Sequence, residues 1–474
     1  MKSHSSFLIF LFMISPFSGE VFGENVLEFS EVWEKIRVES ANLQTKASEV
    51  KTNEIAKSRS AKHWLPKVYA DARTFRTDDP TLNFMGKLGQ RSANASDFST
   101  ESLRYQPSNF LDSNNQPYNG INPNNANLFA KDTLNHPGNN SYSKGTLGVE
   151  LPLFEGGSKV AAHSIREKRL HAVLSEEKYF RFLEYSKAAI HYQSIVLAEE
   201  NRTRAENLSE QIRNFLNRYR IGNRSNPVGF SGHLALQSLQ LILDVSKKEF
   251  ESLRISSEET LLLSAPGLGE NFKPKRNTLF SFADKYLPVP KEKDSVHSPL
   301  AEVYRFQSEE AQEGIEAEKA KFLPKIAAYA ETYAYNGARN QANSYNAGIY
   351  LQMNLLDPSD LGALDEAKAK AENARKKSKE IRQNEENRFK ILVSRERIVF
   401  ENLNSIYESM RLQEEQLQVS QKLFRNGTIQ APQMAESFSA MANLLKLKSS
   451  SELEYLKIRS ELSLYSSHEN SYEK

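Results

Sequence analysis

Two long segments of this chain contain neither glycine nor proline. Each comprises 64 residues, one at 158–221 and the other at 363–426. Because glycine and proline are the strongest interrupters of regular structure, such runs are unusual in compact globular domains. As continuous helices with a rise of about 1.5 Å per residue, the segments would each be roughly 96 Å long. The sequence therefore predicts two long helical rods.

Apolar residues recur in both rods at the spacing of a coiled coil, with steps of four, three and four residues. The first rod contributes Leu208, Ile212, Phe215 and Tyr219, and the second contributes Val399, Leu403, Ile406 and Met410. Such a stripe needs a partner surface that excludes water. We therefore expect each rod to pack lengthwise against other helices.

The sequence around the rods is duplicated. Residues 64–68 read WLPKV and residues 322–326 read FLPKI, and each of these stretches precedes one rod. Behind the rods, an aromatic residue and an arginine precede both Gly222 and Gly427, and a proline follows each glycine after five residues. These matches predict an internal structural repeat.

The chain start reads as a secretory signal. It has a basic residue at Lys2, an apolar stretch from Phe7 to Phe17 and a small residue, Gly23, that fits the site at which a signal peptidase cleaves. A membrane-spanning helix would need about 20 apolar residues. We predict a signal peptide at 1–23, a first structural repeat at 24–265, a linker at 266–299, a second structural repeat at 300–468 and a C-terminal tail at 469–474.

Each repeat is predicted to combine helices with a pair of strands. The first has a helical stretch at 27–63, strands at about 64–76 and 142–154, a long helix at 158–221 and a helix at 233–264. The second has a helix at 300–321, strands at about 322–335 and 345–356, a long helix at 363–426 and a helix at 433–467. Residues 77–143 contain 13 asparagines and are expected to form a long, exposed and partly flexible loop.

Aliphatic residues alternate with polar or small ones in the predicted strands. The aliphatic positions are Leu147, Val149 and Leu151 in one strand and Ile349, Leu351 and Met353 in another. This period of two is typical of a strand that faces lipid on one side and water on the other. It is also typical of a hairpin packed on a soluble core. Because a closed barrel takes about eight strands, this chain would need to share its strands with other subunits.

Composition excludes several kinds of chemistry. The chain has no cysteine, so it has no disulfide, no thiolate metal site and no cysteine nucleophile. Its net charge of +2 does not indicate a nucleic-acid partner. We find no nucleotide, redox or clustered acid–base motif and predict neither an enzyme nor a bound cofactor. His163, Glu167 and His171 share a helix face, but the positive charge around them favours a solvated surface over a metal site.

The combination of these features resembles the TolC family of outer-membrane efflux proteins across nearly the whole mature chain. The resemblance rests on the Leu-Pro-Lys strand starts, the sequence PLFEGG at 152–157, the two rods and the glycine turns that end them. Residues 79–107 also resemble the first external loop of a subset of that family, whereas 111–143 look like an insertion.

The resemblance implies a mainly α-helical fold with a β-barrel part. A homotrimer would build a twelve-stranded outer-membrane barrel from four strands per subunit, joined to a long periplasmic α-helical barrel. Loop 77–143 would face the outside of the cell. The implied function is efflux of small molecules or type I secretion, with a periplasmic adaptor (a membrane fusion protein) and an inner-membrane transporter as partners.

The resemblance also assigns roles at the ends of the rods. The turns with Tyr219, Gly222, Phe424 and Gly427 would form a periplasmic tip on which adaptors dock. Many relatives constrict the tunnel with one basic and two acidic residues, and the aligned positions here are Ile429, Gln433 and Glu436. Only Glu436 keeps its charge, and three copies of it would form a carboxylate ring that favours cations. The alternative for Glu436 is an ordinary solvated surface position.

A second hypothesis is a structural or adhesive coiled-coil protein of the cell envelope without transport activity. The rods would then act as spacers and the asparagine-rich loop as a contact surface. The two hypotheses differ most clearly in ion conductance, which only a duct supports.

Overall fold

The computed structural model describes residues 25–94, 97, 111–112, 114–117, 135–218, 225–269, 272–290 and 298–466. The predicted signal peptide and C-terminal tail lie outside these residues. The chain divides into two compact units, which are described separately below. The helical unit comprises 1–52, 171–305 and 377–474, and the sheet unit comprises 53–170 and 306–376.

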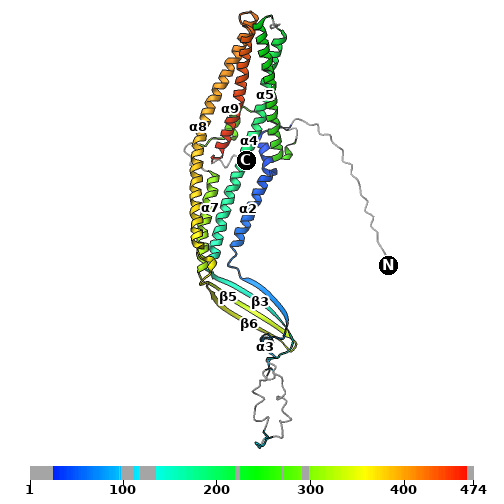
Figure 1. Ribbon diagram of the computed structural model, residues 1–474, viewed down its shortest axis with the longest axis vertical. Coiled ribbons are helices and arrows are strands. Elements are labelled where there is room, and N and C mark those ends of the chain that lie inside the picture. The colour runs from blue at the N-terminus through cyan, green and yellow to red at the C-terminus, as the bar shows by residue number, and fades with distance from the viewer. Residues whose placement is uncertain are drawn as a thin grey trace, which may run out of the picture. The chain divides into compact units, whose positions relative to one another are not determined.

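Four helices dominate the helical unit (Figure 1). They are α4 (Ser158–Arg218), α5 (Pro227–Ser264), α8 (Ala363–Arg425) and α9 (Ala431–Ser463), of which α4 and α8 have 61 and 63 residues and extend into the sheet unit. The two predicted rods are therefore continuous helices. Within the described residues, no helix is both long enough and apolar enough to cross a membrane.

The predicted coiled-coil stripes form the core between these helices. Leu208, Ile212 and Phe215 of α4 are buried, and so are Val399, Leu403, Ile406 and Met410 of α8. Tyr219, the last residue of the first stripe, lies outside the described residues. One core cluster joins α4 and α8 to Leu236 of α5 and to Phe438 of α9. The stripes thus pack as expected from their spacing.

A second core cluster corrects the prediction of a linker at 266–299. The described part of this segment contains the 3-10 turn η5 (Pro266–Leu268), strand β4 (Phe272–Pro274) and helix α6 (Leu279–Tyr286). Phe272 and Phe282 are buried in the same cluster as Phe29, which belongs to helix α1 (Phe29–Glu39). Strand β4 also pairs in parallel with β1 (Asn25–Leu27). The prolines suggested a linker, but the apolar residues between them fold into the core.

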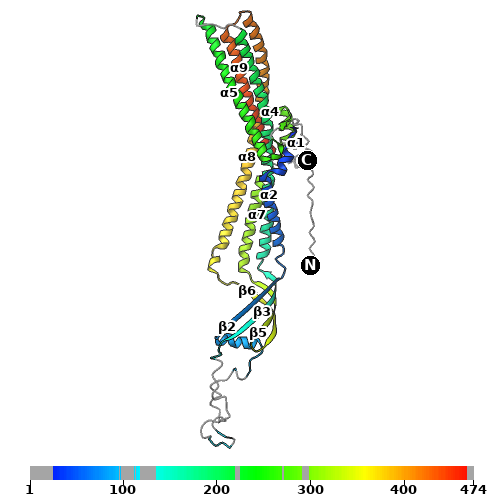
Figure 2. The ribbon, with the colours of Figure 1, turned by 90° about the vertical axis from the view of Figure 1, so that its right-hand side faces the viewer.

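The sheet unit contains four antiparallel strands that run side by side as one curved sheet (Figure 2). They are β2 (Lys67–Thr77), β3 (Asn140–Glu155), β5 (Lys325–Gly337) and β6 (Gln341–Gln352), in the spatial order β2-β3-β5-β6. Strands β2 and β5 begin directly after Pro66 and Pro324. Strand β6 begins before the predicted residue 345 and ends before Met353, which therefore lies beyond the strand.

Shorter helices lead into the strands. Helix α2 (Ala41–Ser60) precedes β2, and helix α7 (Pro299–Lys319) with the 3-10 turn η6 (Ala320–Phe322) precedes β5. The turn η7 (Pro358–Asp360) separates β6 from α8. Within the sheet unit, Lys57 of α2 forms an ion pair with Glu167 of α4 at 2.7 Å, and Lys168 pairs with Glu309 of α7 at 2.8 Å.

The loop predicted at 77–143 is in part a helix. Residues Pro80–Gly89 form α3, whose N-cap Asp79 accepts a hydrogen bond from the Leu82 amide at 2.8 Å. A proline in the first turn also suits a helix start, because its missing N–H would have no partner there. The loop prediction rests on the asparagines of the whole segment, whereas this part of it forms a helix in spite of its two glycines.

Candidate functional site

One face of the four-stranded sheet is apolar. In one row across the sheet, Val68 pairs with Val149, Val149 pairs with Ala330, and Ala330 pairs with Ala347. The predicted lipid-facing residues of the strands share this face, namely Leu147, Val149, Leu151, Ile349 and Leu351. They are exposed in the single chain, Ile349 by 71% and Leu351 by 66%. Large apolar side chains in a contiguous exposed patch indicate a surface that meets a partner or a membrane.

The opposite face of the sheet carries tyrosines and charged residues. Tyr69 and Tyr333 both donate hydrogen bonds to the carboxylate of Glu331. Tyr350 donates to Glu150 at 2.6 Å. The ammonium group of Lys144 lies 4.5 Å from the centroid of the Tyr333 ring, within the distance at which a cation is attracted to an aromatic face. This polar face suits contact with water.

The two outer strands of the sheet are paired on one side only. Among the described residues, β2 pairs only with β3 and β6 pairs only with β5. An unpaired strand edge presents a row of free backbone N–H and C=O groups, which is a template for pairing with another chain. The edges of β2 and β6 run for 11 and 12 residues, so each offers a long surface.

Helix α3 lies on the polar face of the sheet, and sequence reasoning missed its contacts. An added Cβ atom on Gly86 would lie 2.5 Å from the ring of Tyr142, and one on Gly89 would lie 2.7 Å from the ring of Tyr335. Tyr335 pairs across the strands with Lys144, which places these rings on the polar face. The glycines therefore allow a closer approach of helix and sheet than alanine would permit.

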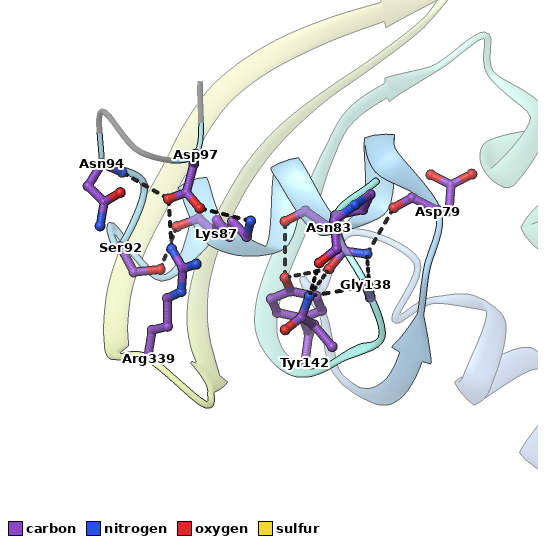
Figure 3. A network of polar contacts seen from close by, with 11 residues as sticks. Asp79, Asn83, Lys87, Ser92, Asn94, Asp97, Gly138, Tyr142 and Arg339 are labelled. Atoms are coloured by element: carbon purple, nitrogen blue, oxygen red, sulfur yellow. Dashed lines mark hydrogen bonds and ion pairs between the residues drawn. The ribbon is translucent and has the colours of Figure 1, made fainter. Parts of the chain in front are cut away.

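A buried ion cluster holds α3 in place (Figure 3). The carboxylate of Asp97 accepts hydrogen bonds from Lys87 of α3 at 3.0 Å, from Arg339 of the β5–β6 turn at 2.7 Å and from the Asn94 amide at 3.1 Å. The side chains of Asp97 and Lys87 are only 5% and 8% exposed. Hydrogen bonds from Arg339 and Lys87 hold the pKa of Asp97 well below its usual range, although burial acts in the opposite direction.

A second polar cluster fixes the start of α3 (Figure 3). The buried amide of Asn83 donates to the carbonyls of Thr77 at 3.0 Å and Asp79 at 3.1 Å. Its oxygen accepts hydrogen bonds from Tyr142 and from Asn140, both at 2.8 Å. Asn83 is therefore bonded to the ends of both strands that flank the loop.

The second predicted turn contains a left-handed glycine. Gly427 has φ of 74° and lies two residues after the end of α8. Its amide donates to the Phe424 carbonyl at 3.0 Å, and the next amide, of Thr428, donates to the Leu423 carbonyl at 2.9 Å. This bond pair is a Schellman motif, which ends a helix abruptly at a residue without Cβ. The centroid of the Phe424 ring lies 4.6 Å from the centroid of the Phe215 ring. The residues predicted for the first turn, Tyr219 and Gly222, lie outside the described residues.

The predicted gate residues lie together between this turn and the first two turns of α9. Gln433 and Glu436 are exposed and lie three residues apart, which places them on one helix face, and Ile429 is half-buried. Gln433 also has a structural role, because its side-chain oxygen accepts the Gln430 amide at 2.8 Å and completes a capping box.

The histidine and glutamate of the first rod make other contacts. His163 lies 2.9 Å from the hydroxyl of Ser60, and Glu167 accepts a hydrogen bond from Lys57 at 2.7 Å. In the described part of the chain, no group of three His, Asp or Glu side chains is arranged to hold a metal ion.

Several solved structures share this fold. The outer membrane channel CmeC of Campylobacter jejuni has a TM-score of 0.69 at 10% identity, over 94% of this chain and 88% of that chain. The outer membrane channel MtrE of Neisseria gonorrhoeae has a TM-score of 0.66 at 12% identity, over 92% and 88%. The outer membrane protein VceC of Vibrio cholerae has a TM-score of 0.63 at 12% identity, over 92% and 94%.

Sequence comparison alone finds no such likeness. No protein-family model matches the chain, and no curated protein sequence matches it. The similarity is therefore one of fold, and it extends over nearly the full length of both partners in each comparison. This chain has the fold of the outer-membrane channels of the TolC family, in agreement with the resemblance drawn from its sequence.

Proposed function

We propose that this chain is the subunit of an outer-membrane duct that carries small molecules or secreted polypeptides from the periplasm to the outside of the cell. The observation that carries this proposal is the sheet, which is open at both edges, apolar on one face and polar on the other. Its contribution is passive: the duct supplies a path, and the chain has no role as an enzyme. The channels that share the fold support this conclusion.

The apolar face of the sheet would lie against lipid. Strands β3 and β6 have 16 and 12 residues, enough for the 9 to 11 or so residues that a tilted strand needs to cross the hydrocarbon core. Every backbone group inside a membrane needs a hydrogen-bond partner, and the free edges of β2 and β6 cannot find one in lipid. The edges must therefore pair with other copies, and a homotrimer of four-stranded sheets would close a twelve-stranded barrel whose polar face lines the passage.

The ends of the long helices would receive a periplasmic adaptor. The helical unit has a groove of about 330 Å³ between α4 and α8, lined among others by Asn207, Gln211 and Gln421. A smaller groove shares Gln211 and Gln421 and adds Arg218 and Arg425 near the end of both helices. The larger groove is also lined by apolar residues such as Leu208 and Leu417. Such a mixed surface suits the docking of an amphipathic helical hairpin from an adaptor, through which an inner-membrane transporter would supply cargo and energy.

The gate assignment belongs to the same proposal. Gly427 ends α8 and returns the chain into α9, whose first turns carry Gln433 and Glu436 on one exposed face. If that face lines the tunnel in the trimer, three copies of Glu436 form a carboxylate ring that favours cations. In the cell, the helical part would lie in the periplasm and loop 77–143 would face outside.

A charge on the apolar face tests the membrane assignment. Val149→Arg should lower the stability of the assembled protein by about 2 to 4 kcal/mol if the residue faces lipid near the midplane. The matched control is Thr146→Arg on the polar face of the same strand, because Thr146 pairs with Asp71 across the sheet. The measurement is folding of both variants into lipid vesicles, followed by urea titration.

The control should fold like the wild type, and Val149→Arg should not. Equal stability of the two arginine variants would contradict a lipid-facing role for this face.

Ion conductance of the wild type in planar bilayers separates the duct from a structural or adhesive envelope protein, which would not conduct.

A further inference from the structure

Helix α3 has the reverse of the usual polarity of a packed helix. The side toward the sheet carries the buried residues Asn83, Gly86 and Lys87. The side away from the sheet carries Leu82, Met85 and Leu88, which are 48%, 60% and 45% exposed. A helix on a protein surface normally buries its apolar stripe and exposes its polar residues. Here polar and small residues fix the helix to the sheet, and the apolar residues project from it.

The position of α3 along the strands is also defined. Tyr142 lies near the start of β3, and Gly337, its partner in the sheet, is the last residue of β5. The helix therefore covers the polar face at the end where β5 turns into β6. Strand β2 starts after helix α2 and strand β3 leads into helix α4, so α3 lies at the other end of the strands. That end is the outer mouth if the sheet crosses the outer membrane as proposed.

We infer that α3 is an apolar constriction at the outer mouth of the duct, held across the passage by the Lys87–Asp97–Arg339 ion cluster. This inference rests on the proposed function, because it takes the polar face as the lining of the passage. A helix with its side chains is about 10 Å wide. Three such helices, one from each subunit, would fill much of a twelve-stranded barrel, whose width lies between that of a filled eight-stranded barrel and that of an open porin.

The chemistry of the constriction follows from its side chains. A narrow ring of leucine and methionine offers water and ions no hydrogen-bond partners, so it opposes their passage by dewetting. Apolar or amphipathic cargo would pass such a ring more easily than small ions. The methionine side chain adapts its shape to a passing molecule, because it is unbranched and flexible.

The ion cluster holds the C-terminal half of the helix, whereas the Asn83 cluster holds its start. Asp97 joins α3, through Lys87, to the β5–β6 turn, through Arg339. Arg339 is the most accessible member of the cluster, with 45% of its side chain exposed. Removing Arg339 leaves Asp97 and Lys87 paired with each other, so the protein keeps a neutral buried pair. Helix α3 then loses its ionic tie to the turn and keeps the hydrogen bond from the Asn340 side-chain amide to the Gln90 carbonyl at 2.8 Å.

The first test compares channel conductance in planar bilayers. Arg339→Ala should raise the open conductance by about twofold or more if α3 narrows the passage. Arg339→Lys, which keeps the charge, should stay close to the wild type. Arg73→Ala is the matched control, because Arg73 lies on the same face of β2 but pairs with Asp71 instead of α3. Because Arg73 lies on the face that would line the passage, this variant measures the effect of removing a positive charge alone, and its change in conductance should be smaller than that of Arg339→Ala.

The second test uses the absence of native cysteine, which makes any introduced thiol unique. Met85→Cys should react with a water-soluble, positively charged thiol reagent added to the conducting channel, and the current should fall. Leu147→Cys on the apolar face should show no change of current, because its thiol would face lipid. Because this test does not use an Arg339 variant, it remains informative if Arg339→Ala assembles poorly.

The outcomes distinguish failure of the constriction from failure of the duct. A wild type that conducts, with unchanged currents in Arg339→Ala and in thiol-modified Met85→Cys, would overturn the constriction and leave the duct in place. A wild type that never conducts would overturn the proposed function, and the constriction with it.

Discussion

Asp97 is an acidic residue that is almost completely buried in a region whose sequence reads as a polar loop. Its three hydrogen-bond donors come from α3, from the backbone beside it and from a turn 242 residues away in the chain. A buried charge is tolerated only when it is paired and fully hydrogen-bonded. Asp97 meets this condition and, together with Asn83, connects the loop to the sheet.

The lowered pKa of Asp97 predicts how α3 responds to acid. A carboxyl group with a depressed folded-state pKa stabilises the structure at all pH values above its unfolded pKa of about 3.9, and this stabilisation is lost as the pH falls through the folded value. We therefore expect α3 to remain docked from pH 8 to pH 5. Hydrogen exchange of residues 80–89, corrected for intrinsic rates, should show equal protection at both pH values. Loss of protection at pH 5 would contradict this account of the cluster.

Glu436 gives a second prediction at this scale. Glu436→Gln should lower the preference of the channel for cations, because it removes the remaining charge of the predicted gate. Gln433→Glu is the converse variant, since it adds a second carboxylate one turn earlier on the same face and keeps an acceptor for the Gln430 amide. It should raise cation preference. Reversal potentials in a salt gradient measure both effects, and identical values for all three proteins would place Glu436 on the solvated outer surface.

At the scale of elements, a buried arginine anchors the segment from η5 to α6, in addition to its apolar core contacts. Arg459 of α9 donates to the carbonyls of Ala283 at 3.1 Å and Leu287 at 3.0 Å at the end of α6, and the Ala283 carbonyl also accepts the Leu287 amide at 2.8 Å. It also forms ion pairs with Asp284 at 2.9 Å and Glu396 at 3.3 Å. A cationic side chain at a helix C-terminus is favourable for both hydrogen bonding and the helix dipole.

Replacing this arginine should loosen the whole segment. Removing one partner from a buried charge network costs about 3 to 5 kcal/mol, and we expect a loss of this size in the free energy of unfolding for Arg459→Ala. The control is Arg395→Ala, whose ion pair with Glu454 is half exposed and should contribute about 0 to 1 kcal/mol. Fluorescence of Trp33, which is 3% exposed in the same core, reports unfolding in denaturant. Equal losses in the two variants would contradict the proposed anchor.

The sequence predicted the regular elements better than their connections. The rods were evident because 64 residues without glycine or proline leave few alternatives to a helix. The strands were evident because aliphatic residues alternate along them, although β6 is displaced toward the N-terminus and leaves Met353 outside. Helix α3 was not predicted because it lies in a segment whose many asparagines indicate a loop. Its two glycines also disfavour a helix, and the tyrosine rings packed against them explain their presence. The contact between Asp97 and Arg339 joins residues 242 positions apart, and no sequence pattern near either residue predicts it.

At the scale of the whole molecule, the two units pose different physical problems. The helical unit buries its apolar stripes within one chain, with side chains such as Ile212 and Leu403 completely enclosed. The sheet unit leaves large apolar side chains exposed and two strand edges unpaired among the described residues. Such a sheet is incomplete as a single copy in water. Lipid would cover the exposed apolar side chains on one face, and further copies would pair with the strand edges.

The proposed duct therefore requires several copies to pair through their strand edges. Electron cryomicroscopy of the protein extracted in detergent tests it most directly, because it reveals both the number of copies and the pairing of β2 with β6. We predict a threefold assembly in which the β2 edge of each copy pairs with the β6 edge of the next to form one closed sheet. Single copies with free strand edges, or an assembly held only by its helices, would contradict the claim.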